Sequence, residues 1–361
     1  MKKKLLFTAY SLGLGGIEKA LINLLNRLDY NKYEVTLILE KKEGMFLDLI
    51  PSDVKIIEYK ISDNKIVLLR KIKNRLKLIY WKLKLHKTFD FSCAFTTYSI
   101  PGAHLALAGS NNSTLWVHNN YHIVYPNDND LKVFLDGVFT TRFKRVVFVS
   151  KDNMNDVCKH YKGIKDKSIV CNNFIDGKKI IDSSLEKIDF KRNNNPLFVN
   201  VGRHDEYQKR LTRIIDATKR LVNEGYQFQI MFIGDGPDSL MYEELIKQNK
   251  LEDVILIMGS QKNPYPYYKM ADAVLLSSEF EGYPVVFLES MIMNKPILST
   301  KVSDYEELDN NYGMFCEKND DAVYKMMKKY LNNGFKLKEK FDYIKYNEDI
   351  EKKIESMING N

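Results

Sequence analysis

Short apolar runs alternate with amphipathic helical stretches along most of the 361 residues, and this alternation constrains the fold more than any other feature. Strands that alternate with helices pair in parallel through right-handed crossovers. The pattern therefore predicts an α/β fold made of two doubly wound, Rossmann-like sheets. The runs cover residues 4–9, 34–39, 54–59, 91–96, 113–117, 145–149 and 168–171 in the first half, and 197–201, 228–233, 254–258, 273–276 and 296–299 in the second.

A polar, irregular stretch separates the two halves and ends in an asparagine run followed by Pro196, as linkers commonly do. We therefore predict a first domain over residues 1–173, a linker over 174–195 and a second domain over 196–344. A charged helical segment at about 345–361 can pack back on the first domain. Because α/β sheets bind ligands beyond the carboxyl ends of their strands, two such domains are expected to face each other across a substrate cleft.

The four cysteines are widely scattered, with no Cys-x-x-Cys pair and no histidine at ligand spacing. This argues against a disulfide framework and a zinc site, and for a reducing compartment. The basic start of the chain, residues 1–16, imitates a signal peptide, but its apolar run is short and interrupted by glycines, so we interpret it as the first strand. No run approaches the roughly 20 apolar residues of a membrane-spanning helix. The sequence predicts a cytoplasmic protein.

Glycines cluster in the turn after the first predicted strand, where Gly15 and Gly16 precede a helix. Such glycines let backbone amides approach an anion at the helix N-terminus, so phosphate binding is one interpretation and a merely tight turn is another. A nicotinamide site is disfavoured, because Glu18 replaces the third glycine of the dinucleotide fingerprint.

A second strand–turn–helix junction carries two cations. Arg203 follows the strand at 197–201, and Lys209 is predicted at the start of the next helix. Arginine can chelate two phosphate oxygens and lysine adds a point charge, so the pair suits a diphosphate. Two solvated surface cations are the alternative.

A third junction, after the strand at 273–276, contains two glutamates. Glu281 lies in the loop, residues 282–284 shape a turn, and Glu289 lies one turn into the following helix. Because apolar residues surround Glu289, its carboxylate needs a partner, and sugar hydroxyls would serve. A salt-bridged glutamate and an acid at a helix N-terminus are the alternative.

Glu281 and Glu289, separated by seven residues with Gly282 directly after the first, resemble the two-glutamate motif of family-4 retaining glycosyltransferases. That family has the GT-B fold of two facing Rossmann-like domains and includes enzymes of bacterial cell-surface polysaccharide synthesis. The sequence departs from the family pattern at Arg210 and Pro284, where glycine is more common. Further pieces of the resemblance lie at residues 15–18, 173–176, 202–209, 233–237, 258–259 and 271–272.

The resemblance implies transfer of a sugar from a nucleotide diphosphate donor, by default a UDP-sugar, to a glycan hydroxyl with retention at the anomeric carbon. Glu289 would hold the ribose, and Glu281 would face the donor sugar. The diphosphate and the sugar would also contact Gly15, Gly16, Arg203, Lys209 and the amides of Gly282, Tyr283 and Pro284. A nucleotide-sugar epimerase of the same architecture and a non-catalytic partner subunit are the alternative functions.

In the resembled family a histidine of the first domain contacts the donor sugar. His118, after the strand at 113–117, occupies the matching place. His122 lies nearby but is not the predicted sugar contact. An uncommitted histidine is the alternative. Residues 128–130 (Asp-Asn-Asp) superficially match a metal-binding triplet, but they lie in a polar loop, so we interpret them as a helix N-cap. No metal or other cofactor is expected.

One segment carries the charge imbalance of the chain, whose net charge is +8: residues 65–87 hold nine lysines and arginines and no acid. The nearly neutral remainder argues against nucleic-acid binding, which usually needs a basic face. We predict a helix whose apolar stripe packs on the first sheet and whose cations face the anionic inner surface of the cell membrane. This peripheral position suits a lipid-linked acceptor; a solvated helix face is the alternative. The stripe consists of Leu69, Ile72, Leu76, Ile79 and Leu83.

Overall fold

The chain separates into two compact units in the computed structural model, which describes residues 1–13 and 15–360. Unit 1 contains residues 1–175 and the C-terminal residues from Tyr346 onward, and unit 2 contains residues 176–345. Asn347 fixes the return of the chain to unit 1, because its side-chain amide donates to the Ile175 carbonyl and accepts from the Ile175 amide.

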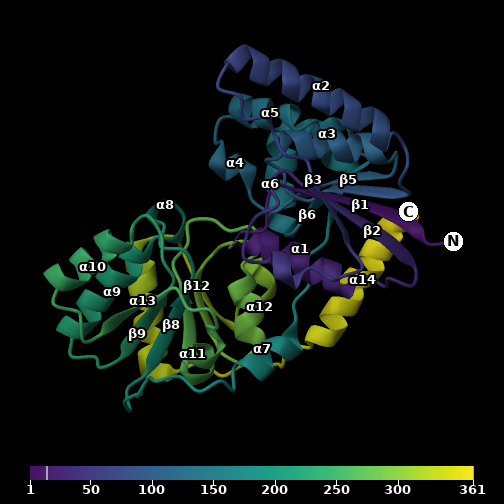
Figure 1. The fold of residues 1–361 in the computed structure, drawn as a ribbon. Coiled ribbons are helices and arrows are strands. Elements are labelled where there is room, and N and C mark those ends of the chain that lie inside the picture. The colour runs from purple at the N-terminus through teal and green to yellow at the C-terminus, as the bar shows by residue number, and fades with distance from the viewer. Residues whose placement is uncertain (14, 361) are drawn as a thin grey trace. The chain divides into compact units, whose positions relative to one another are not determined.

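A parallel sheet forms the centre of unit 1, with the strand order β3-β2-β1-β4-β5-β6-β7 among the described residues (Figure 1). In β1 every residue from Leu5 to Ala9 is buried, as a strand covered by helices on both faces requires. Because the chain builds the sheet outward in both directions from β1, the carboxyl ends of β1 and β4 form a topological switch point, where α/β proteins bind ligands. The strands are β1 (Lys3–Ala9), β2 (Tyr33–Leu39), β3 (Lys55–Glu58), β4 (Phe91–Ala94), β5 (Ser113–Val117), β6 (Arg145–Phe148) and β7 (Ser168–Val170).

Helices cover both faces of this sheet, with α1 and α14 on one side and α3 on the other (Figure 1). Helix α14 includes the C-terminal segment that was expected to pack back on the first domain. The helices are α1 (Gly16–Arg27), α2 (Val67–Leu85), α3 (Ile100–Gly109), α4 (Tyr121–Val124), α5 (Asp128–Gly137), α6 (Lys151–His160) and α14 (Tyr343–Asn359), with short 3₁₀ turns at Leu47–Leu49, Thr140–Arg142 and Lys162–Lys167.

Helix α2 forms within the basic segment, but the prediction of which face packs inward is wrong. The stripe expected to pack on the sheet is exposed along its whole length. Instead Leu78, Trp81 and Leu85 pack into a cluster with Tyr59 and Leu105, where the large Trp81 ring lies against Tyr59 at the edge of the sheet. No helix in the described parts of the chain is long and apolar enough to span a membrane.

Unit 2 is built around a second parallel sheet, whose described strands run in the order β10-β9-β8-β11-β12-β13. The strand β13 completes one edge and was not predicted from the sequence, and α7 forms within the expected linker. The elements are α7 (Gly177–Ser183), β8 (Leu197–Val201), α8 (Glu206–Lys209), α9 (Leu211–Asn223), β9 (Gln229–Ile233), α10 (Ser239–Gln248), β10 (Ile255–Gly259), α11 (Tyr265–Met270), β11 (Ala273–Leu276), α12 (Val285–Ile292), β12 (Ile297–Thr300), a 3₁₀ turn (Tyr305–Glu307), β13 (Gly313–Cys316) and α13 (Asp320–Asn333).

Candidate functional site

In unit 2 the turn after β8 brings Lys209 to the carboxyl end of the sheet. Asp205 caps α8 by accepting a hydrogen bond from the Gln208 amide. Lys209 is the last residue of this short helix, not the first of the next one as the sequence predicted. The helix stops there because Arg210 adopts a left-handed conformation, with φ of 51°, before α9 begins. Glycine adopts this conformation most readily, which gives a physical reason for the glycine that the resembled family has at this position.

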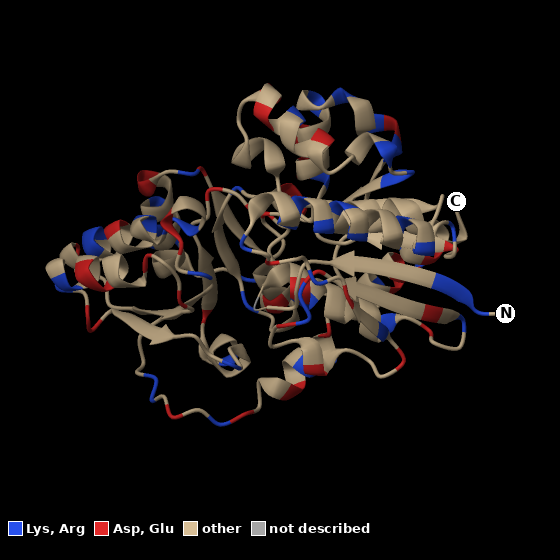
Figure 2. Ribbon diagram, turned by 45° about the horizontal axis from the view of Figure 1, so that its top comes forward, with Lys and Arg blue, Asp and Glu red and all other residues tan. Residues whose placement is uncertain are grey.

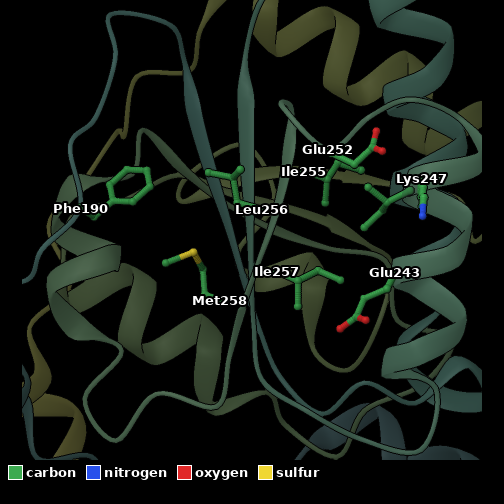
Figure 3. Close-up of a pocket in the computed structure, with 9 residues that line it drawn as sticks. Phe190, Glu243, Lys247, Glu252, Ile255, Leu256, Ile257 and Met258 are labelled. Atoms are coloured by element: carbon green, nitrogen blue, oxygen red, sulfur yellow. The ribbon is translucent and has the colours of Figure 1, made fainter.

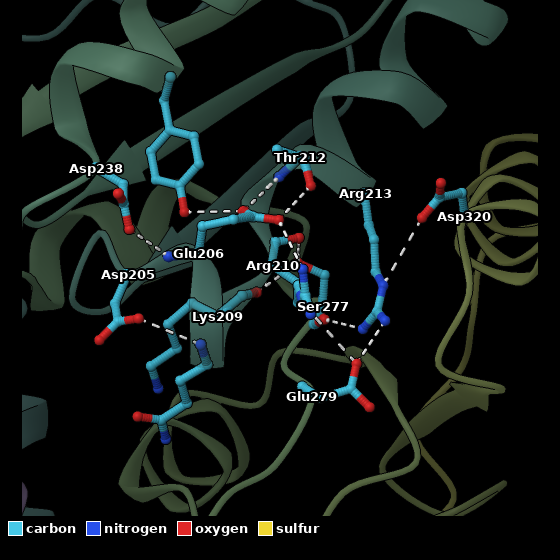
Figure 4. A network of polar contacts seen from close by, with 12 residues as sticks. Asp205, Glu206, Lys209, Arg210, Thr212, Arg213, Asp238, Ser277, Glu279 and Asp320 are labelled. Atoms are coloured by element: carbon cyan, nitrogen blue, oxygen red, sulfur yellow. Dashed lines mark hydrogen bonds and ion pairs between the residues drawn. The ribbon is translucent and has the colours of Figure 1, made fainter.

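Polar contacts fix the corner formed by Lys209 and Arg210 (Figure 4). The Ser277 hydroxyl, directly after β11, lies 2.9 and 2.8 Å from the carbonyl oxygens of these two residues. Arg213 of α9 is buried and donates to the Ser277 carbonyl at 3.0 Å and to the Glu279 carboxylate at 2.6 Å. The position of Lys209 is therefore set jointly by α9 and by the loop after β11.

The carboxylate of Glu281, a residue only 7% exposed, lies at the centre of a polar cluster. Lys209 Nζ and Ser278 Oγ donate to Oε1 at 2.6 and 2.7 Å, and Gln208 Nε2 donates to Oε2 at 3.2 Å. The Lys209 side chain is also largely covered, so the ion pair is screened less by water than a surface pair. The structure thus brings two predicted residues together and adds Gln208 and Ser278, which no sequence signal indicated.

Arg203 is not part of this cluster. Its side chain is 69% exposed, and its guanidinium lies 3.9 Å from the carboxylate of Asp205. Ion pairs of this length in water contribute little, so this contact does not hold the guanidinium in one place.

Glu289 lies on α12 and is 4% exposed. The hydroxyls of Tyr265 and Tyr268, both on α11, donate to its two carboxylate oxygens at 3.0 and 2.8 Å. These tyrosines are partners of the kind that a buried carboxylate requires, whereas the sequence argument expected a salt bridge or sugar hydroxyls. Burial, and then the neighbouring charge of Glu289, raise the pKa of Tyr268 far above its usual range, so this hydroxyl remains a donor.

The turn between the two glutamates is held by its backbone. The carbonyl of Gly282 accepts from Ser303 Oγ at 2.7 Å. Pro284 caps α12 with φ of −64°, which is the value that its ring imposes. Tyr283 is half-buried, and burial raises the pKa of its hydroxyl.

In unit 1 the glycine-rich turn leads directly into α1, with Gly15 as the N-cap residue and Gly16 as the first residue of the helix. The Glu18 carboxylate folds back over this turn, and a Cβ at Gly15 would collide with it. Burial raises the pKa of Glu18. Because this carboxylate already occupies the positive end of the helix, an anionic ligand could bind there only after Glu18 moves or takes up a proton. Leu14, in the same turn, lies outside the described residues.

His118 follows β5 and is 7% exposed. Its ring lies 4.6 Å from the Phe95 ring and parallel to Trp116, and neither ring nitrogen has a hydrogen-bond partner among the described residues. Burial lowers the pKa of His118 to about 3, an effect that the nearby Phe95 backbone offsets only in part. The imidazole is therefore neutral at physiological pH and has unused hydrogen-bonding capacity.

His122, the neighbouring histidine, belongs to a separate cluster in which its ring stacks on His160 at 3.6 Å. His122 Nδ1 lies 3.0 Å from the Asp156 carboxylate, and His160 Nδ1 lies 2.9 Å from Asp128. His122, Asp128 and His160 offer ligand atoms within 4.8 Å of one another. Parallel rings do not direct their lone pairs at one point, so we interpret the cluster as hydrogen-bonded pairs. The N-cap of α5 is Asn127 rather than the following Asp-Asn-Asp triplet.

A cavity of about 620 Å³ lies along β10, the outer strand of the second sheet (Figure 3). Side chains of β10 and Phe190 form its apolar wall, and Glu243 and Lys247 of α10 add charges. None of the predicted site residues lines this cavity, which is distinct from the Lys209–Glu281 cluster.

Residues 183–348 match the family model described as "Glycosyl transferases group 1". The N-acetylgalactosamine-N,N'-diacetylbacillosaminyl-diphospho-undecaprenol 4-alpha-N-acetylgalactosaminyltransferase of Campylobacter jejuni is 27% identical over 343 residues, which cover 92% of this chain and 91% of that protein. The uncharacterized glycosyltransferase MJ1059 of Methanocaldococcus jannaschii is 27% identical over 199 residues. That match covers 53% of this chain and spans only 49% of the archaeal protein.

Among solved structures, HepE from Anabaena in complex with UDP matches with a TM-score of 0.75 and 17% identity, covering 99% of this chain and 100% of that one. At this identity the likeness shows the fold alone. The predicted α/β fold of the GT-B type, with two doubly wound sheets, is confirmed. The family match and both relatives are similarities to glycosyltransferases.

Proposed function

We propose that the chain is a retaining glycosyltransferase that transfers a sugar from a UDP-linked donor to a hydroxyl of a lipid-linked glycan in surface polysaccharide synthesis. The observation that carries this proposal is the buried Lys209–Glu281 pair at the carboxyl end of the second sheet, where α/β folds bind ligands. The UDP complex of HepE supports a UDP-linked donor. The name of the Campylobacter relative contains a glycan linked to diphospho-undecaprenol, which supports a lipid-linked acceptor. No observation favours the epimerase or the non-catalytic subunit.

The hard step in such a transfer is departure of the diphosphate while positive charge grows on the anomeric carbon. Lys209 is held at the sheet edge and can exchange Glu281 for a phosphate oxygen, which places a cation beside the growing negative charge. Arg203, whose guanidinium makes a long 3.9 Å contact with Asp205, can turn toward the same phosphates and chelate two oxygens.

The carboxylates are assigned to hydroxyl groups of the donor. Once Lys209 engages phosphate, Glu281 can accept from sugar hydroxyls, while Ser278 and Gln208 keep its carboxylate in place. Glu289 is assigned to the ribose hydroxyls, because a buried carboxylate accepts hydrogen bonds from hydroxyl groups, as it does from Tyr265 and Tyr268.

His118 is assigned to the donor sugar. A buried polar group without a partner costs free energy, and sugar hydroxyls that pair with the His118 nitrogens on binding would recover it. The amides near Gly15 and Gly16 are assigned to the diphosphate, with displacement of the Glu18 carboxylate as a condition of binding.

Calorimetric titration with UDP tests the nucleotide site. Lys209→Met and Glu289→Gln are expected to weaken UDP binding at least about tenfold, since each removes a charge-assisted contact. Lys247→Met and Glu243→Gln, at the β10 cavity, are matched controls that should bind UDP like the wild type. Absence of UDP binding by the wild-type chain, or equal losses in the controls, would refute the assignment.

Retention is tested separately, by NMR of the product formed from a UDP-sugar of known anomeric configuration. A product with the donor's configuration supports the proposal, and an inverted product refutes the retaining mechanism. Turnover of the donor to an isomer without any acceptor would instead identify the epimerase.

A further inference from the structure

One face of α2 is apolar and open to solvent. Leu69, Ile72, Leu76, Ile79 and Leu83, called here the α2 ridge, are between 42% and 74% exposed. Exposed leucines are ordinary when single, but a contiguous row along a 19-residue helix marks an interaction surface. The α2 ridge does not pack on the rest of unit 1, because the opposite face of α2 makes those contacts.

Cations border the α2 ridge on both sides. With a turn of about 100° per residue, one row of lysines and arginines falls on each flank of the ridge, between it and the packed face. Figure 2 shows how these residues recur along α2, and residues 65–87 contain no acid. One row consists of Lys71, Arg75 and Lys82, and the other of Arg70, Lys73, Lys77 and Lys84.

We infer that the α2 ridge docks on an anionic membrane surface. An interfacial helix places its apolar residues at the boundary of the acyl chains, and long basic side chains on its flanks reach the headgroups. Most of the flanking cations are placed for this arrangement, and each of these gains from the negative potential of the leaflet. Lys77 and Lys84 contact unit 1 instead: Lys77 donates to the Lys60 carbonyl, and Lys84 lies 4.8 Å from the centre of the Trp81 ring. Helix α2 would lie in the plane of the interface over about 28 Å, the length of 19 helical residues.

Two other partners would each match only one of the two features of this surface, the apolar ridge or the flanking cations. A second copy of the chain could cover the ridge, but it would bring two sets of cations together without any acid from this segment. A nucleic acid could neutralise the cations but would leave the apolar ridge in water. A lipid surface satisfies both features at once, so charge complementarity and the apolar row together select it.

This inference rests on the proposed function for its purpose, since a lipid-linked acceptor lies at a membrane. Docking itself is measured without any transfer reaction, so the two proposals can fail separately. If UDP binding is lost and vesicle binding persists, the proposed function fails alone. The reverse result refutes docking alone.

Co-sedimentation of the full chain with phosphatidylglycerol-rich and with pure phosphatidylcholine vesicles tests the docking. We expect binding to the anionic vesicles that weakens as salt rises and is at least about tenfold weaker on neutral ones. Changing Arg70, Lys71, Lys73 and Arg75 to Gln should weaken binding by about fivefold per cation. Changing Leu69, Leu76 and Leu83 to Gln should also weaken it at least tenfold, because these side chains would no longer enter the leaflet.

The control variants carry the same changes on exposed residues of the other unit or another helix. Changing Lys329, Lys336, Lys338 and Lys340 to Gln removes an equal charge. Changing Val133, Leu185 and Leu240 to Gln removes an equal number of exposed apolar residues. All variants should keep wild-type UDP affinity. Equal binding to neutral vesicles, no binding to either kind, equal losses in the controls, or a dimer in sedimentation velocity that the ridge variant dissociates would each overturn the inference.

Discussion

His118→Phe should stabilise unit 1 and reduce transfer. In the structure this imidazole is buried against Phe95 and Trp116, and its two nitrogens make no hydrogen bond to the described residues. Phenylalanine keeps an aromatic ring in the same apolar contacts and removes the unpaired polar atoms. Because an unsatisfied buried polar group costs about 1–3 kcal/mol, we expect the free energy of unfolding to rise by about 1–2 kcal/mol at pH 7.

The gain should grow as the pH falls. Burial lowers the pKa of His118 from 6.5 in the unfolded chain to about 3 in the folded one. Between these values the unfolded state binds the proton and the folded state does not, so wild-type stability falls with decreasing pH below about 6.5. From pH 7 to pH 5 this linkage amounts to about 2 kcal/mol, which the phenylalanine variant does not lose.

Urea unfolding followed by tryptophan fluorescence measures this effect in unit 1, since both tryptophans, Trp81 and Trp116, lie there. His86→Gln is the control, because it removes an exposed imidazole from the same unit. The same preparations are assayed for sugar transfer, which we expect to fall at least tenfold in His118→Phe. A variant that is less stable at both pH values, or one that transfers sugar at the wild-type rate, would refute the reasoning.

Three further predictions concern other residues. Arg203→Ala and Lys209→Ala should each lower the transfer rate by about 10²–10³, as loss of one charge-stabilising donor does in other enzymes; turnover above half of the wild-type value in both would contradict the diphosphate assignment. Transfer should persist in a metal chelator, and a loss of activity that magnesium or manganese restores would show a metal requirement. Leu85→Ala should lower the free energy of unfolding by about 2–4 kcal/mol because Leu85 is buried, whereas Leu83→Ala, on the α2 ridge, should change it by less than about 0.5 kcal/mol in urea unfolding.

The sheets were predictable because their strands combine short length, apolar residues and regular alternation with helices. The run at 113–117 matches β5 residue for residue, and 273–276 matches β11. The strand β13 escaped prediction because Gly313–Cys316 is short, begins with glycine and has no β-branched residue. Parallel pairing with β12 forms this strand, although its local sequence does not favour one.

In the site, the sequence identified charged residues but not the groups that hold them. Lys209 and Glu281 lie 72 positions apart, and their ion pair follows from the order of β8 and β11 in the sheet, which local spacing does not reveal. Tyr265 and Tyr268 could have been predicted to share a helix face from their spacing of three residues, but nothing local indicates that Glu289 lies opposite them.

Helix α2 shows where periodicity alone is insufficient. Two sets of apolar residues recur at helical spacing in this segment, the ridge and the row that includes Leu78, Trp81 and Leu85, and either could face a core. The longer row was expected to pack inward, yet the shorter one does, because its tryptophan fills the space beside Tyr59 at the edge of the sheet. A helix with apolar residues on two opposite faces needs two partners. The comparison of Leu85→Ala with Leu83→Ala measures which face the fold of unit 1 uses, and the vesicle experiment measures what the other face binds.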